Sequence, residues 1–120
     1  MKKIILIGGY PKGFAEPFHV KTRSGKILRK ITDDLKISPI FFDLWNNKKE
    51  ENSRKLKLVT KKKLIKFIGK DYILVALGRY IEKVLVGKNI SCFYLPHPAS
   101  RDKKYIYALK SGLAKIANNI

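Results

Sequence analysis

Ile4-Ile5-Leu6-Ile7-Gly8-Gly9 is a short, unbroken aliphatic run that two glycines stop. An apolar run without polar alternation is typical of a strand that is buried on both faces, as in a parallel sheet between two layers of helices. Two further runs, Pro39 to Trp45 and Tyr72 to Leu77, are continuous and rich in aromatic or β-branched residues, and Ile90 to Leu95 makes a fourth. The sequence therefore predicts four buried strands.

Helical patterns separate these strands and follow the last one. Apolar residues at helical spacing predict helices between Ser24 and Pro39, from Thr60 to Gly69, from Tyr80 to Gly87 and from about Asp102 to Ile116. Ser24 and Thr60 are the predicted N-caps of the first two helices. Strictly alternating strands and helices predict an α/β fold: one domain over residues 1–120, with a four-stranded parallel sheet in a three-layer α/β/α arrangement.

Length and composition exclude several classes of protein. The chain has 120 residues, a single cysteine and no apolar run near eighteen residues, which argues against a disulfide scaffold, a membrane span or two ordinary domains. The apolar run after Met1-Lys2-Lys3 is too short for a secretory signal. We therefore expect an intracellular protein, either cytoplasmic or associated with the nucleoid, with a viral gene as one alternative source, in which Cys92 stays a thiol.

Charge indicates the kind of partner. Lysine and arginine number 27 against 9 acidic residues, a net charge of +18, and each quarter of the chain is net positive. Such a field favours polyanions, and the best basic stretch, Thr60 to Lys66, is short for a membrane-binding helix. We expect DNA as the partner, no membrane contact and a monomer. The alternative is that many of these lysines form only a solvated face.

Three loops leave the carboxyl ends of the predicted strands, the edge where open α/β sheets bind ligands: Gly8 to Arg23, Asn46 to Val59 and Pro96 to Arg101. In the last of them, prolines on both sides of His97 restrict the backbone and fix the direction of the histidine. A rigidly held histidine at a ligand-binding edge suggests chemistry, although an isolated loop histidine is the ordinary alternative.

Four blocks of the chain, taken in order, resemble motifs of the uracil-DNA glycosylase superfamily: Gly8 to Pro11; Pro17-Phe18 with Ser24 to Leu28; Val75 to Tyr80; and Leu95 to Pro98. The resemblance implies strand order 2-1-3-4 and a monofunctional DNA glycosylase of base excision. Such an enzyme flips a base, here a deaminated or modified pyrimidine, and hydrolyses its N-glycosidic bond. Some branches hold an iron–sulfur cluster with four cysteines, whereas this chain has only Cys92. We expect no cluster, metal or other cofactor.

The resemblance also implies catalytic roles. His97 would donate a hydrogen bond to the pyrimidine O2, and the backbone amides of Gly9 and Tyr10 would add to the stabilisation of the leaving base. The family usually has an acid, Gln or Asn just after the first glycine, where this chain has Gly9 and Tyr10. Glu16 is the only carboxylate of the first loop, so it is either the general base or an exposed loop acid.

The same resemblance also implies which residues recognise the flipped base. Eight residues separate Asp43 from Asn52-Ser53-Arg54, so Asp43 stands where the family commonly has an Asn that reads the pyrimidine edge. An ionised Asp offers only acceptors, which predicts a preference for a 4-amino or modified pyrimidine over uracil. Asn46 is the reader instead if the register shifts by three residues. Phe18 either stacks on the flipped base or belongs to the core.

Residues around the motif loops are the predicted DNA contacts: Lys12, Lys21, Arg54, Ser100, Arg101 and Lys103. Lysines and arginines there would neutralise phosphates of single- or double-stranded DNA, and relatives place at Arg101 the residue that fills the gap in the duplex. Two rival functions remain. One is a glycosylase-fold protein that binds DNA without catalysis; the other is a small nucleotide- or RNA-binding α/β domain.

Overall fold

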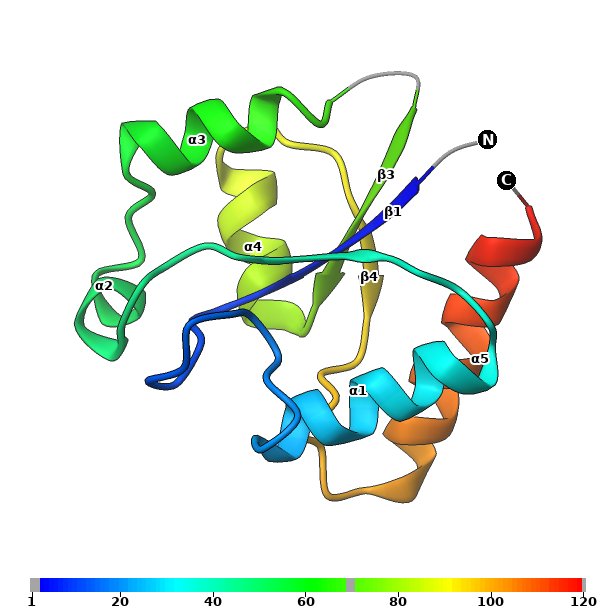
Figure 1. The fold of residues 1–120 in the computed structure, drawn as a ribbon. Helices are drawn as coiled ribbons and strands as arrows, with labels where there is room; N and C mark the ends of the chain where they lie inside the picture. The colour runs from blue at the N-terminus through cyan, green and yellow to red at the C-terminus, as the bar shows by residue number, and fades with distance from the viewer. Residues whose placement is uncertain (1–2, 69–70, 120) are drawn as a thin grey trace.

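Strands and helices alternate along the chain, as Figure 1 shows for the computed structural model, which describes residues 3–68 and 71–119. The strands are β1 (Lys3–Gly8), β2 (Ile40–Asp43), β3 (Tyr72–Leu77) and β4 (Phe93–Leu95). The helices are α1 (Arg23–Asp34), α2 (Lys48–Ser53), α3 (Leu58–Ile65), α4 (Arg79–Gly87) and α5 (Lys103–Asn118).

All pairings in the sheet are parallel, and the strand order is β2-β1-β3-β4. The predicted α/β class, the four-stranded parallel sheet and its order 2-1-3-4 are thereby confirmed. Helices α1 and α5 cover one face of the sheet, and α3 and α4 cover the other (Figure 1). The register places Gly8, at the end of β1, beside Asp43, at the end of β2.

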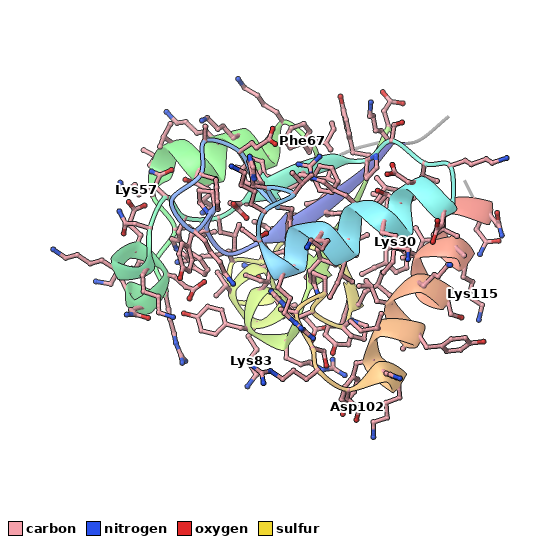
Figure 2. All side chains as sticks on the ribbon, turned by 60° about the horizontal axis from the view of Figure 1, so that its bottom comes forward. Lys30, Lys57, Phe67, Lys83, Asp102 and Lys115 are labelled. Carbon is pink, nitrogen blue, oxygen red and sulfur yellow. The ribbon has the colours of Figure 1, made fainter. Side chains whose placement is uncertain are left out.

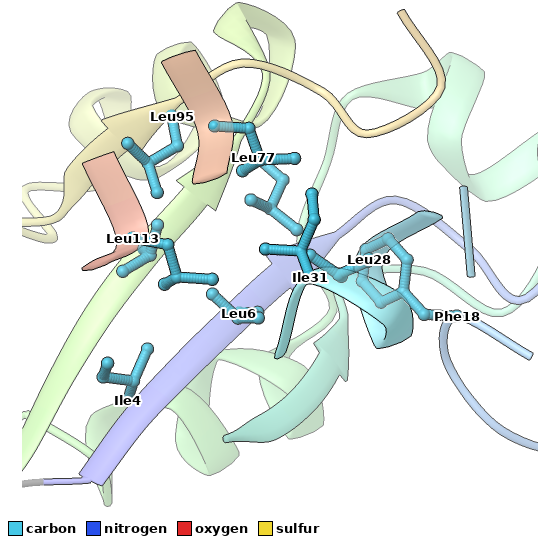
Figure 3. Close-up of a cluster of buried hydrophobic side chains, with 10 residues drawn as sticks. Ile4, Leu6, Phe18, Leu28, Ile31, Leu77, Leu95 and Leu113 are labelled. Carbon is cyan, nitrogen blue, oxygen red and sulfur yellow. The ribbon is translucent and has the colours of Figure 1, made fainter. Parts of the chain in front are cut away.

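The aliphatic run of β1 is unbroken because both of its faces are buried. Ile4 and Leu6 belong to a cluster with residues of α1 and α5, among them Leu28 and Leu113 (Figure 3). Ile5 and Ile7 face the opposite way and join a second cluster, with residues of α3 and α4. None of these four β1 side chains is more than 4% exposed. Two cores, one on each side of a single sheet, therefore hold the strand ends in place.

Both predicted N-caps were wrong. Thr22, not Ser24, caps α1, because its Oγ1 accepts a hydrogen bond from the Gly25 amide at 2.9 Å. Helix α3 begins after Lys57, upstream of Thr60, and no side chain caps it. The predicted end of that helix, Gly69, lies outside the described residues.

Two further elements differ from the sequence prediction. Strand β4 spans only Phe93–Leu95, although Ile90 is buried in the second core. Helix α2 was not predicted; Asn47 caps it by accepting from the Glu50 amide at 2.9 Å. This short helix brings an acidic first turn to the end of the sheet.

Side chains tipped with nitrogen project around the outline of the molecule in the view of Figure 2. Among residues 3–68 and 71–119, no helix is long and apolar enough to cross a membrane. The described part of the chain also contains no group of three or more His, Cys, Asp or Glu side chains placed to hold a metal ion.

Candidate functional site

A cavity of about 50 Å³ lies at the carboxyl ends of the strands. The segments that line it come from the loop after β1, the start of α1, the end of β2, helix α2 and the loop after β4. Its lining residues are Gly9, Tyr10, Pro11, Lys12, Phe18, Thr22, Ser24, Asp43, Glu51 and His97. Residues up to 88 positions apart in the sequence thus meet at the edge where open α/β sheets bind ligands.

The sheet itself positions Asp43 in the cavity lining, because β2 ends at Asp43 beside the end of β1. A Cβ on the neighbouring Gly8 would overlap the Phe18 ring and lie 3.0 Å from Asp43 Oδ1, so the strand ends pack closely. Asp43 Oδ2 is buried and has no hydrogen-bond partner among the described residues. Burial, and secondarily the negative charge of Glu51, raise the pKa of Asp43 to about 7.

Glu51 comes into the cavity from α2. A Cβ on Gly9 would overlap Glu51 Oε2, which means that this carboxylate fills the space left by the missing side chain. Lys48 lies 3.8 Å from Glu51 Oε1, and the Tyr80 hydroxyl donates to the Glu51 carbonyl at 2.5 Å. The site therefore holds two carboxyl groups, one on β2 and one on α2.

Backbone contacts fix the orientation of His97. Its Nδ1 accepts from the Ala99 amide at 3.0 Å, and its carbonyl accepts from the Ser100 amide at 3.1 Å. Burial, and secondarily the positive charge of Lys12, lower the pKa of His97. With Nδ1 acting as an acceptor, the neutral imidazole carries its proton on Nε2 and can donate it in a hydrogen bond.

Phe18 serves both the core and the cavity. It is only 7% exposed, belongs to the cluster of α1 and α5, and lines the cavity with its ring against Gly8. Its backbone is left-handed at φ +51°, a conformation that costs about 1–3 kcal/mol for a residue with a side chain. Arg29 supports this turn: Nε donates to the Phe18 carbonyl at 2.6 Å, and the guanidinium lies 4.5 Å from the Phe41 ring centroid.

Most of the predicted catalytic and base-binding residues meet in the cavity: Gly9, Tyr10, Phe18, Asp43 and His97. Two do not. The Glu16 side chain is 57% exposed and pairs with Arg29 at 3.6 Å, outside the cavity lining. Asn46 is exposed at the start of the loop before α2 and also lies outside the lining.

The predicted DNA contacts differ in exposure and in whether they line the cavity. Lys12 is exposed and lines it, while Lys21, Arg101 and Lys103 are exposed on neighbouring loops and at the start of α5. Ser100 is half-buried. Arg54 does not line this cavity; its guanidinium lies 5.0 Å from the Tyr80 ring centroid, beside a second cavity of about 260 Å³.

Four lining residues were not predicted as site residues: Pro11, Thr22, Ser24 and Glu51. Glu51 follows Asp43 by eight residues, and the pair Asn47 and Glu50 is a capping signal that predicts a helix start just before it. The capping signal predicts where α2 begins, but it does not predict the direction in which the Glu51 side chain points.

The site combines a neutral imidazole donor, two carboxyl groups of different surroundings, an aromatic ring and a lysine at the rim. Such a set can polarise a carbonyl, accept a proton from water and bind an anion nearby. Comparisons with protein-family models, with curated proteins and with solved structures found no match to the chain.

Proposed function

We propose that the protein is a DNA N-glycosylase that binds a flipped pyrimidine, deaminated or modified, in the cavity at the carboxyl edge of the sheet. One observation carries the proposal: His97, Asp43 and Glu51 line the same cavity although they come from three separate segments. The net charge of +18 supplies the affinity for a polyanion. We expect the protein to act as a monomer inside the cell.

In the proposed hydrolysis, His97 and Glu51 have separate roles. A water oxygen forms a bond to the sugar C1′ while the bond from C1′ to the base nitrogen breaks, and the bonding electrons leave with the base. His97 Nε2–H donates to the O2 of the departing base, where negative charge develops. Glu51 accepts the proton of the attacking water, and the base anion is then protonated by solvent. We assign this role to Glu51 rather than Glu16 because Glu51 lines the cavity.

DNA binding must offset the cost of base flipping, which is a few kcal/mol. Lys12, Lys21, Arg101 and Lys103 are exposed near the cavity and are suited to phosphate contacts. The Phe18 ring borders the cavity, and stacking of a base on an aromatic ring contributes about 1–3 kcal/mol.

A second candidate function is sequence-independent DNA binding without catalysis. The size of the cavity favours it: about 50 Å³ is room for water, whereas ligand pockets usually measure about 300–1,000 Å³. In the glycosylase account, Tyr10 must move outward as the base enters, and Glu51 stays in the cavity. In the binding account the cavity stays closed.

End-labelled oligonucleotides separate the two functions. Single- and double-stranded substrates carrying uracil, cytosine, hypoxanthine or 5-hydroxymethyluracil at one position are incubated with protein and then treated with hot alkali, which breaks the strand at abasic sites. We expect breakage at one kind of base, lost in Glu51→Gln and retained in Glu16→Gln. Binding of every strand without breakage at any base would favour the second function.

A further inference from the structure

We propose that Asp43 gates base selection by a proton: a 4-keto pyrimidine is accepted only when the Asp43 carboxyl is neutral, whereas a 4-amino pyrimidine is accepted in both states. This inference rests on the proposed function, since it assigns the reading of the bound base to one side chain. It makes the choice of base depend on pH within the range that cells experience.

The position of Asp43 is the first reason. Oδ2 is buried and unpartnered among the described residues, and Oδ1 lies against Gly8 at the end of β1. An unpartnered buried polar atom is costly, and it is most costly when the group is ionised. A ligand that supplied a hydrogen bond to this oxygen would remove that cost.

The chemistry of the two carboxyl states is the second reason. A neutral carboxyl has one O–H donor and one carbonyl acceptor, which match the O4 acceptor and N3–H donor of uracil as an amide does. A carboxylate has acceptors only, so it repels O4 but still accepts from the 4-amino group of cytosine. The same side chain thus presents two different sets of hydrogen-bond donors and acceptors, one in each protonation state, without a change of position.

The groups around Asp43 favour the neutral state near neutral pH. Glu51 on α2 faces it with negative charge, and both that charge and burial raise the pKa of Asp43 to about 7. From the other segments, Thr22, Ser24 and Tyr10 contribute hydroxyl groups, Lys12 contributes a cation at the rim, and His97 is neutral above its lowered pKa. Because Lys12 is exposed, solvent screens the effect of its charge on Asp43.

Two measurements test the gate. The first is a ¹³C titration of the Asp carboxyl groups in the free protein, with Asp43→Asn to assign the signal. We expect the Asp43 signal to titrate near neutrality and to move to lower pH in Glu51→Gln, because the like charge is gone. Titration of Asp43 in the ordinary acid range would overturn the inference even for an active glycosylase.

The second measurement is the affinity for single strands carrying 2′-fluoro-2′-deoxyuridine or 2′-fluoro-2′-deoxycytidine, which resist cleavage, followed by anisotropy between pH 6 and pH 8. The ratio of uracil to cytosine affinity should fall about tenfold with rising pH in the wild type, as expected for one proton, and stay flat in Asp43→Asn. A flat wild-type ratio, with both bases bound better than an abasic strand, overturns the gate alone. Equal affinity for all three strands overturns the base-binding function and the gate together.

Discussion

The carboxylate of Glu51 occupies the space that a side chain at position 9 would need, since a Cβ on Gly9 would overlap Glu51 Oε2. The first loop has no acid next to Gly8, yet the cavity receives one from α2. The absence of a side chain at Gly9 therefore leaves the space in the cavity that the Glu51 carboxylate occupies.

Gly9→Ala should displace Glu51 without unfolding the protein. The Cβ meets the far end of a flexible side chain, which can rotate outward, so we expect the free energy of unfolding to change by less than about 1 kcal/mol. Excision should fall as far as in Glu51→Gln, and the double variant should be no slower than either single one because both remove the same interaction. Wild-type excision by Gly9→Ala would show that Glu51 is not the base.

Asp43→Asn should stabilise the protein above neutral pH. The pKa of Asp43 is raised from 3.8 to about 7, so the folded state binds more protons than the unfolded state between these values, and wild-type stability falls as pH rises through that window. Relative to the wild type, the variant should gain roughly 3 kcal/mol between pH 4 and pH 8, measured by urea unfolding. The exposed Asp33→Asn is the control; an equal pH-dependent gain there would contradict the assignment.

Gly25→Ala should destabilise the fold although alanine favours helices. Its Cβ would overlap the backbone carbonyls of Phe18 and His19, which cannot rotate away. We expect a loss of at least about 2 kcal/mol in the free energy of unfolding. Gly87→Ala, in α4 with nothing within 4 Å of its Cβ, is the matched control and should be neutral or stabilising. Equal changes in the free energy of unfolding for the two substitutions would mean that the backbone at Phe18 and His19 can shift at little cost.

Salt dependence should locate the DNA interface. If Arg101 and Lys103 each neutralise a phosphate, Arg101→Ala and Lys103→Ala should each reduce the slope of log affinity against log salt by about 1. Lys115→Ala is the control, because Lys115 lies in the last turn of α5, at the opposite end of that helix from Asp102 (Figure 2). A larger change from Lys115→Ala than from the other two would move the interface to the far end of α5.

The fold was predictable because β1 alone carries a distinctive pattern. Four consecutive aliphatic residues cannot alternate between core and solvent, so Ile4 to Ile7 require helices on both faces. The position of His97 was predictable for a similar local reason, since prolines flank it. The cavity wall at α2 was not, because which way Glu51 faces depends on how a six-residue helix packs against Tyr80 and the strand ends. Glu16 shares a loop with the cavity residues but lies by Arg29, a contact that spacing does not encode.

The role of His97 as the donor to the leaving base is tested by the rate of base excision in single-turnover conditions, compared between wild type and His97→Ala on the base found to be cleaved. We expect His97→Ala to slow excision by about 10²- to 10³-fold, the usual effect of removing one such donor, while the affinity for undamaged DNA stays within twofold. We also expect wild-type excision to decline as His97 becomes protonated in acid, below its lowered pKa. Equal rates in the two proteins, or no excision of any base by the wild type, would contradict this role.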